Sequence, residues 1–120
     1  MKRITLLVLI AASILLSYCS GDKDDAVDPP PTGNNCDNVN KQFAAHVQPI
    51  LNTSCATNSS CHGSGSVNGP GPLLNYTQAK NAAALIKAAV VSGRMPQNGS
   101  LTTAQKNTIS CWVDGGAPNN

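Results

Sequence analysis

The residues best suited to chemistry in this chain are two thiols and an imidazole in one short stretch, Cys55, Cys61 and His62. Covalent haem attachment uses this set, because each thiol adds to one vinyl group and the adjacent imidazole binds the iron. The usual motif has two residues between the cysteines, whereas five stand here, residues 56–60. Six steps along a helix rise about 9 Å, too far for both sulfurs to meet one porphyrin edge. We therefore expect residues 56–60, rich in Asn and Ser, to bulge out as a turn.

Two other uses of these side chains stay open on the sequence alone. The thiols of Cys55 and Cys61 could form a disulfide across the short loop. A zinc ion could take both thiols together with His62 and His46, although zinc-binding pairs usually stand two to four residues apart. Haem attachment is the interpretation favoured here, because His62 directly follows Cys61.

Helices must position these side chains, because apolar residues recur at helical spacing and no stretch alternates convincingly between apolar and polar. We expect three helices, at residues 39–51, 77–92 and 102–114. Pro49 should close or kink the first helix, and Gly93 should end the second. Thr102 and Gln105 have the form of a capping box for the third. Segment 63–75 is loop by its glycine and proline content, so the sequence predicts an all-α domain.

The side chains available for a core are small. Phe43, Tyr76 and Trp112 are the aromatic residues after position 35, and many apolar helix positions are Ala, which buries little area. A domain of about 85 residues with such a core is marginally stable. We expect disulfides to staple it, or a large planar apolar cofactor to fill its centre.

Length and charge exclude several classes of protein. The chain has 120 residues and a formal net charge of +2, which leaves no room for a large enzyme or a multi-pass membrane protein. The positive excess lies in Lys2 and Arg3, and the rest of the chain is balanced. We therefore expect no nucleic-acid-binding surface.

The first 35 residues have the order of a secretory leader and a linker. Residues 1–18 begin with positive charge and continue with an apolar run that is short for a membrane-spanning helix. The run ends at Leu16-Ser17-Tyr18-Cys19, which resembles a bacterial lipoprotein signal, in which the cysteine is lipidated. Residues 19–35, rich in Asp and Pro, are expected to be a disordered tether. Residues 36–120 would then be a folded domain, held on a membrane outside the cytoplasm by the lipid on Cys19.

Six short segments after position 38 follow one another in a recognisable order. They are 47–51 (VQPIL), 61–63 (CHG), 73–76 (LLNY), 93–96 (GRMP), 101–102 (LT) and 112–120 (WVDGGAPNN). In this order and spacing they resemble the small mono-haem cytochrome c domains of lipoproteins from Bacteroidetes-type bacteria. The resemblance implies a cytochrome c-like bundle of three to four short helices around a haem.

The resemblance also implies roles for the residues of the motif. Cys55 and Cys61 would carry haem c through two thioethers, and His62 would bind the iron through Nε2. A carbonyl of the following loop, at Pro70 or Pro72, would accept a hydrogen bond from His62 Nδ1–H and fix the tautomer.

Met95 is implied as the second axial ligand of the iron. It is the one methionine after the leader, and Gly93 and Pro96 beside it suit a shaped loop. Met95 could instead be a core residue that fills a gap, and His46 is a competing second ligand.

A disulfide between Cys36 and Cys111 is implied by the same resemblance, because the first and last helices of a cytochrome c fold cross. Another pairing, such as Cys36 with Cys55, stays open, since a sequence does not determine disulfide connectivity.

The function implied by these expectations is electron transfer. Such a protein holds one haem c and passes single electrons to redox partner proteins outside the cytoplasm. It is not an enzyme, because both axial positions of the iron are filled by His62 and Met95. The alternative is a haem-free lipoprotein module, stapled by disulfides, with a binding or structural role.

Overall fold

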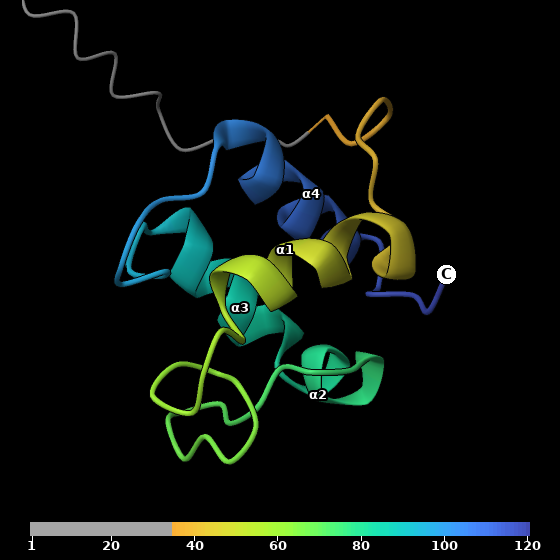
Figure 1. Cartoon of the computed structure of the whole chain (residues 1–120). Coiled ribbons are helices and arrows are strands. Elements are labelled where there is room, and N and C mark those ends of the chain that lie inside the picture. Colours follow the sequence, from red (N-terminus) through yellow and green to blue (C-terminus); the bar gives the residue numbers. More distant parts are fainter. Residues whose placement is uncertain (1–34) are drawn as a thin grey trace, which may run out of the picture.

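A computed structural model describes residues 35–120 of the chain (Figure 1). This part contains four α-helices and one turn of π-helix, joined by loops. In order they are η1 (Phe43–Val47), α1 (Gln48–Ser54), α2 (Tyr76–Asn81), α3 (Ala83–Val91) and α4 (Thr103–Asp114). No strand occurs in this part, so the all-α prediction is confirmed. Every helix in it is too short or too polar to cross a bilayer. The expected leader, the lipid site at Cys19 and the tether up to residue 34 lie outside the described residues.

The first helix differs from the prediction around Pro49. The helical segment begins at Phe43 and not at residue 39, and it does not end at Pro49 but continues to Ser54. Pro49 has no N–H to donate, and in a regular α-helix its ring would crowd the carbonyl four residues earlier. The chain widens instead into the π-turn η1, in which Val47 N donates to Gln42 O at 3.2 Å. Pro49 then stands in the first turn of α1, where a proline is tolerated, so it shapes the start of that helix.

The second predicted helix is two helices. The backbone leaves helical geometry at Ala82 (φ −98°, ψ 2°), which separates α2 from α3. The Tyr76 hydroxyl at the start of α2 donates to Ala117 O at 3.0 Å, whereas α3 packs along α4. Because the two helices face different neighbours, one straight helix over 77–92 cannot make both sets of contacts. Tertiary packing thus overrides the helical propensity of this alanine-rich stretch.

The helix ends predicted at Gly93 and Thr102 are confirmed. Gly93 follows α3 with φ +71°, in the left-handed region that favours glycine, and its N–H donates to Val90 O at 3.2 Å. Thr102 Oγ1 accepts from Gln105 N at 3.2 Å, and Gln105 Oε1 accepts from Thr102 N at 2.9 Å. This capping box starts α4. The two ends anchor the connection between α3 and α4, in which Met95 lies.

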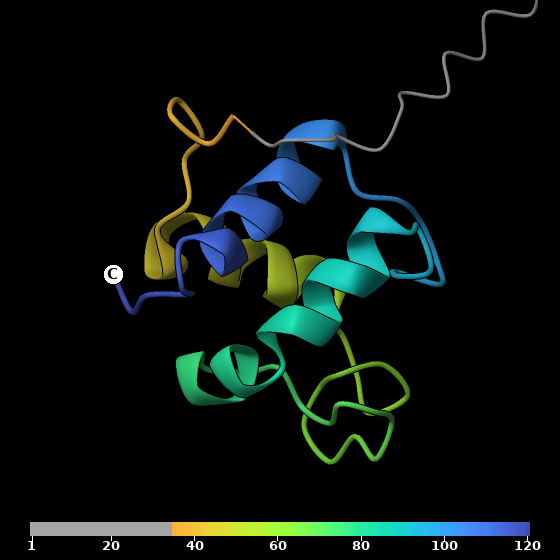
Figure 2. The same ribbon diagram turned by 180° about the vertical axis from the view of Figure 1, so that it is seen from behind.

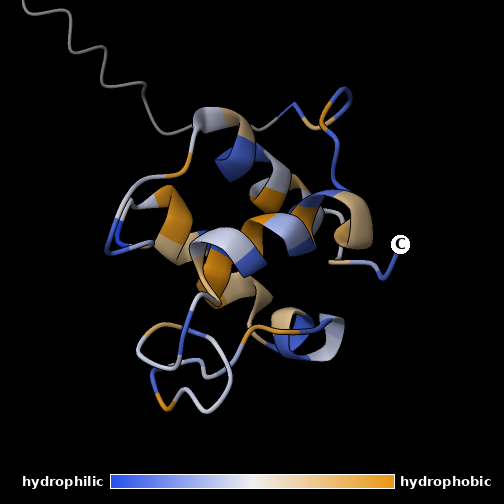
Figure 3. Ribbon diagram, viewed as in Figure 1, coloured by the Kyte–Doolittle hydropathy of each residue, from blue (hydrophilic) through white to orange (hydrophobic). Residues whose placement is uncertain are grey.

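The aromatic residues after position 35 meet in one cluster. Phe43 lies against both Tyr76 and Trp112, with ring centroids 5.2 Å and 5.4 Å away. The cluster joins η1, α2 and α4, and Figure 3 shows hydrophobic residues gathered toward the inside of the helices. Side chains therefore fill the packing between these three elements. A cofactor therefore cannot occupy the space between η1, α2 and α4, and the space left for one is the cavity beside α3.

The C-terminus closes the start of η1. Asn120 Oδ1 accepts from Phe43 N, and the Asn120 carbonyl accepts from Ala44 N, both at 2.9 Å. These contacts satisfy N–H groups that have no partner within the helix. Figure 2 shows the end of the chain beside this first helical segment.

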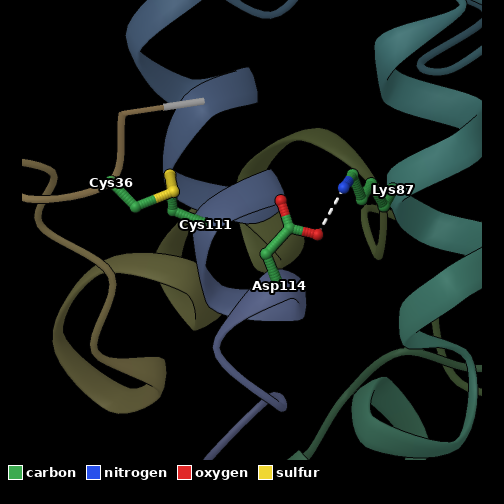
Figure 4. A network of polar contacts seen from close by, with 4 residues as sticks. All are labelled: Cys36, Lys87, Cys111 and Asp114. Atoms are coloured by element: carbon green, nitrogen blue, oxygen red, sulfur yellow. Dashed lines mark hydrogen bonds and ion pairs between the residues drawn. A yellow bond between two sulfur atoms is a disulfide. The ribbon is translucent and has the colours of Figure 1, made fainter. Parts of the chain in front are cut away.

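A disulfide ties the segment before η1 to the last helix. Cys36 is bonded to Cys111 in α4, with Cα atoms 5.5 Å apart (Figure 4). This is the pairing that the resemblance implies, and Cys55 takes no part in it. The bridge spans 75 positions, so the chain-entropy estimate gives a stabilisation of about 4 kcal/mol. The same view shows the ion pair of Lys87 and Asp114 between α3 and α4, which is partly exposed and contributes little.

Candidate functional site

A cavity of about 250 Å³ lies between α3, the loop after His62 and the connection from α3 to α4. Three of the four predicted haem-site residues line it, namely Cys55, His62 and Met95. The rest of the wall is mostly apolar: Gly69, Pro70, Leu73, Leu85, Ile86, Ala89 and Val90, with Arg94 as its cation. The fold therefore brings the end of α1, the loop and the α3–α4 connection to one apolar space.

The insert between the cysteines forms a closed turn. His62 N donates to Cys55 O at 2.9 Å, so the chain returns to where the insert began. The predicted bulge of residues 56–60 is thus present. Cys61 does not line the cavity; it is half-buried and directly precedes His62, which does. Neither cysteine is in a disulfide in this structure, in contrast to the disulfide alternative.

The two thiols lie close enough to affect each other. Burial raises the pKa of the Cys55 thiol above its ordinary value of 9.0, and the charge of Cys61 raises it further. Cys55 therefore stays a neutral thiol at pH 7, as suits its place in an apolar wall.

His62 is buried and held in one orientation. Its Nδ1 lies 3.0 Å from the carbonyl oxygen of Gly71, and its own carbonyl accepts from Leu73 N at 2.9 Å. A carbonyl can only accept, so Nδ1 carries a proton, and in the neutral ring the lone pair is then on Nε2. The sequence predicted Pro70 or Pro72 as the acceptor, and the structure corrects this to the residue between them. Gly71 has φ +95°, a conformation closed to proline.

Met95 reaches the cavity because the chain folds back after α3. Its N–H donates to Ala89 O at 3.1 Å, which holds the connection against the last turns of that helix. The side chain is half-buried. Arg94 beside it is exposed and takes part in no ion pair within residues 35–120. Sequence reasoning missed both Gly71 and Arg94, although the run Gly69–Pro72 and the cation next to Met95 were visible signals.

His46 lies apart from the cavity. It belongs to η1, is absent from the cavity wall, and has a buried Nδ1 without a hydrogen-bond partner in the described part of the chain. No three His, Cys, Asp or Glu side chains within residues 35–120 are gathered so that they could hold a metal ion. The zinc alternative, which needs His46 beside Cys55, Cys61 and His62, therefore has no site here.

The arrangement offers sulfur and nitrogen donors around an apolar space. Cys55 contributes a thiol, His62 an imidazole and Met95 a thioether to the cavity wall, and the second free thiol, of Cys61, directly precedes His62. Comparison with protein-family models, with curated proteins and with solved structures gives no match to this chain. Its function is therefore inferred from these residues and the cavity between them.

Proposed function

We propose that this protein is an electron-transfer carrier that holds one haem c. Cys55 and Cys61 would attach the haem, and His62 and Met95 would bind its iron. The observation that carries the proposal is the meeting of Cys55, His62 and Met95 at one apolar cavity. Cys55 and His62 stand at the two ends of one closed turn, whereas Met95 comes from the distant connection between α3 and α4, and local structure alone does not require it to meet them.

The residues around the cavity suit a haem in three respects. The apolar wall formed by Leu73, Ile86 and Val90 would exclude water from a porphyrin face. The hydrogen bond from His62 Nδ1 to Gly71 O leaves Nε2 as the donor atom and increases its basicity. Both thiols are unpaired and so available for attachment.

Attachment would need no oxidant. Each S–H bond would add across one vinyl C=C bond, with the sulfur bonding to one carbon and the hydrogen to the other. A bound haem would supply one-electron exchange between the ferric and ferrous states, and His62 and Met95 as its ligands would give a higher potential than two histidines. With both axial ligands supplied by the chain, the protein would be a carrier and not an enzyme.

The setting that we propose follows from the sequence. A leader at 1–18 and a lipid on Cys19 would hold the domain on a bacterial membrane, facing the outside of the cytoplasm. Leu85 is 58% exposed although it borders the cavity, so an apolar edge remains where a redox partner protein could approach.

The alternative is a haem-free module with a binding or structural role. Two observations favour it: the aromatic cluster around Phe43 and the Cys36–Cys111 disulfide stabilise the fold without any cofactor. A haem is then not needed to hold the helices together.

The test is to express the chain with its own leader in a host that attaches haem to c-type cytochromes. A haem-stained band on a denaturing gel, with a Soret absorption, is expected. A folded but colourless protein would overturn the proposal in favour of the haem-free module.

The axial ligand is tested separately. We expect Met95→Ala to abolish the sulfur-to-iron charge-transfer band at the red end of the ferric spectrum. His46→Ala is the matched control and should keep that band, because His46 lies away from the cavity. A band that survives in Met95→Ala would assign the sixth position to another residue.

A further inference from the structure

We propose that Asn58 is the positioning residue that brings Cys61 to Cys55, so that a five-residue insert can present both sulfurs to one haem. The inference rests on the proposed function for the haem, but its structural part concerns the thiols alone. Asn58 stands in the middle of the insert, is exposed and touches neither the cavity nor a ligand. Its role would be exerted entirely through the backbone of the residues that follow it.

Asn58 makes four hydrogen-bond contacts to those residues. Its carbonyl accepts from Cys61 N at 3.1 Å and from Gly63 N at 2.8 Å. Its side-chain Oδ1 accepts from Ser60 N at 2.9 Å and from Cys61 N at 3.2 Å. The N–H of Cys61 is thus shared between both acceptors of one residue, which fixes the direction of the backbone that carries the second thiol.

Gly63 makes this closure sterically possible. A Cβ at position 63 would lie 2.7 Å from the carbonyl carbon and oxygen of Asn58, closer than any side chain tolerates. The turn is therefore packed backbone to backbone, with Asn58 against the residue that follows His62.

The following loop fastens the other side of the turn. Asn68 Nδ2 donates to Ser60 O at 2.7 Å, and the Ser66 hydroxyl donates to the Cys61 carbonyl. The same loop supplies the Gly71 carbonyl to His62. Cys61 and His62 are therefore held by one loop, and Asn58 fixes Cys61 from the opposite side.

Without this network the insert would leave Cys61 free to sample many positions relative to Cys55. Ordering those residues costs conformational entropy. In the closed turn they are already ordered in the haem-free protein, so haem attachment does not have to supply this free energy. Removal of the Asn58 side chain deletes two of the four contacts, and each is worth a few-fold to tenfold in an equilibrium.

The first experiment measures attachment in the haem-attaching host. We expect Asn58→Ala to lower the fraction of protein with two thioethers by about tenfold. The singly attached product is recognised because its remaining vinyl group moves the haemochrome α band to longer wavelength. Asn58→Asp keeps the Oδ1 acceptor and should restore double attachment. Asn52→Ala is the control, because Asn52 is exposed and its side chain makes no hydrogen bond within residues 35–120. Equal double attachment in Asn58→Ala and the original chain would overturn the inference.

The second experiment uses the haem-free chain, so that its result does not depend on the proposed function. Oxidised glutathione takes two electrons from Cys55 and Cys61, forms their disulfide and leaves two glutathione thiols. Peptide mapping gives the equilibrium constant, and hence the effective concentration of one thiol at the other. We expect Asn58→Ala to lower this effective concentration about tenfold and Asn58→Asp to keep it within twofold of the original value. An unchanged equilibrium constant in Asn58→Ala would overturn the inference about Asn58. If the constant falls but the protein never binds haem, the role of Asn58 stands and only the proposed electron-transfer function is refuted.

Discussion

Removal of the Cys36–Cys111 disulfide should cost this domain a large share of its stability. The bridge closes 75 positions, for which loop-closure entropy gives about 4 kcal/mol. At 0.05 to 0.15 kcal/mol per residue, a domain of this size has about 4 to 13 kcal/mol in total. Cys36→Ala is the suitable change, because Cys111 is buried and its volume then stays filled.

The assay is urea unfolding of the haem-free chain, followed by far-UV circular dichroism. The free energy of unfolding of Cys36→Ala is expected to be about 4 kcal/mol lower than that of the original chain, and reduction of the bridge should give a similar loss. Cys61→Ala removes a half-buried thiol that takes no part in a disulfide, so it should change the value by less than about 1 kcal/mol.

Two results would refute this reasoning. One is a loss below about 1 kcal/mol in Cys36→Ala with an unchanged slope against urea, because the bridge would then not limit the unfolded chain. The other is an equal loss in Cys61→Ala, because stability would then depend on the cysteine pair at the cavity.

Three further changes test other contacts. Gly63→Ala should cost about 2 kcal/mol in urea unfolding, because its Cβ would meet the Asn58 carbonyl, whereas Gly69→Ala should change little, since no atom lies within 4 Å of a Cβ there. Thr102→Ala should cost about 1 kcal/mol through the lost helix cap, and an unchanged urea midpoint would contradict this. The raised pKa of Cys55 means that the folded state keeps a proton which the unfolded chain releases near pH 9.0, so stability should fall as pH rises past that value. Between pH 7 and 10 the urea midpoint should fall less in Cys55→Ala than in the original chain. An equal dependence of the midpoint on pH in both proteins would contradict a raised pKa of Cys55.

Features set within a few residues were predictable. The capping box of Thr102 and Gln105, the glycine that ends α3 and the turn at 56–60 all depend on local hydrogen bonds and backbone preferences. The break at Ala82 was not predictable from the alanine-rich stretch, because α2 and α3 contact residues far along the chain, Ala117 and helix α4. The hydrogen-bond acceptor for His62 was predicted in the correct loop, at Pro70 or Pro72, but it is the carbonyl of Gly71 between them. The backbone at that position has φ +95°, which glycine adopts and proline cannot.

The candidate set of Cys55, Cys61 and His62 is visible in the sequence, because the order and adjacency of these residues are matters of covalent spacing. The sequence also indicates that helices form around them, since the apolar period is local, although the three residues themselves lie in the turn that follows α1. Only the tertiary structure decided that Met95 lies at the same cavity, and that His46 does not. That outcome depends on how α3 packs along α4 and how the chain folds back after it, and such long-range packing leaves no pattern in any short stretch of residues.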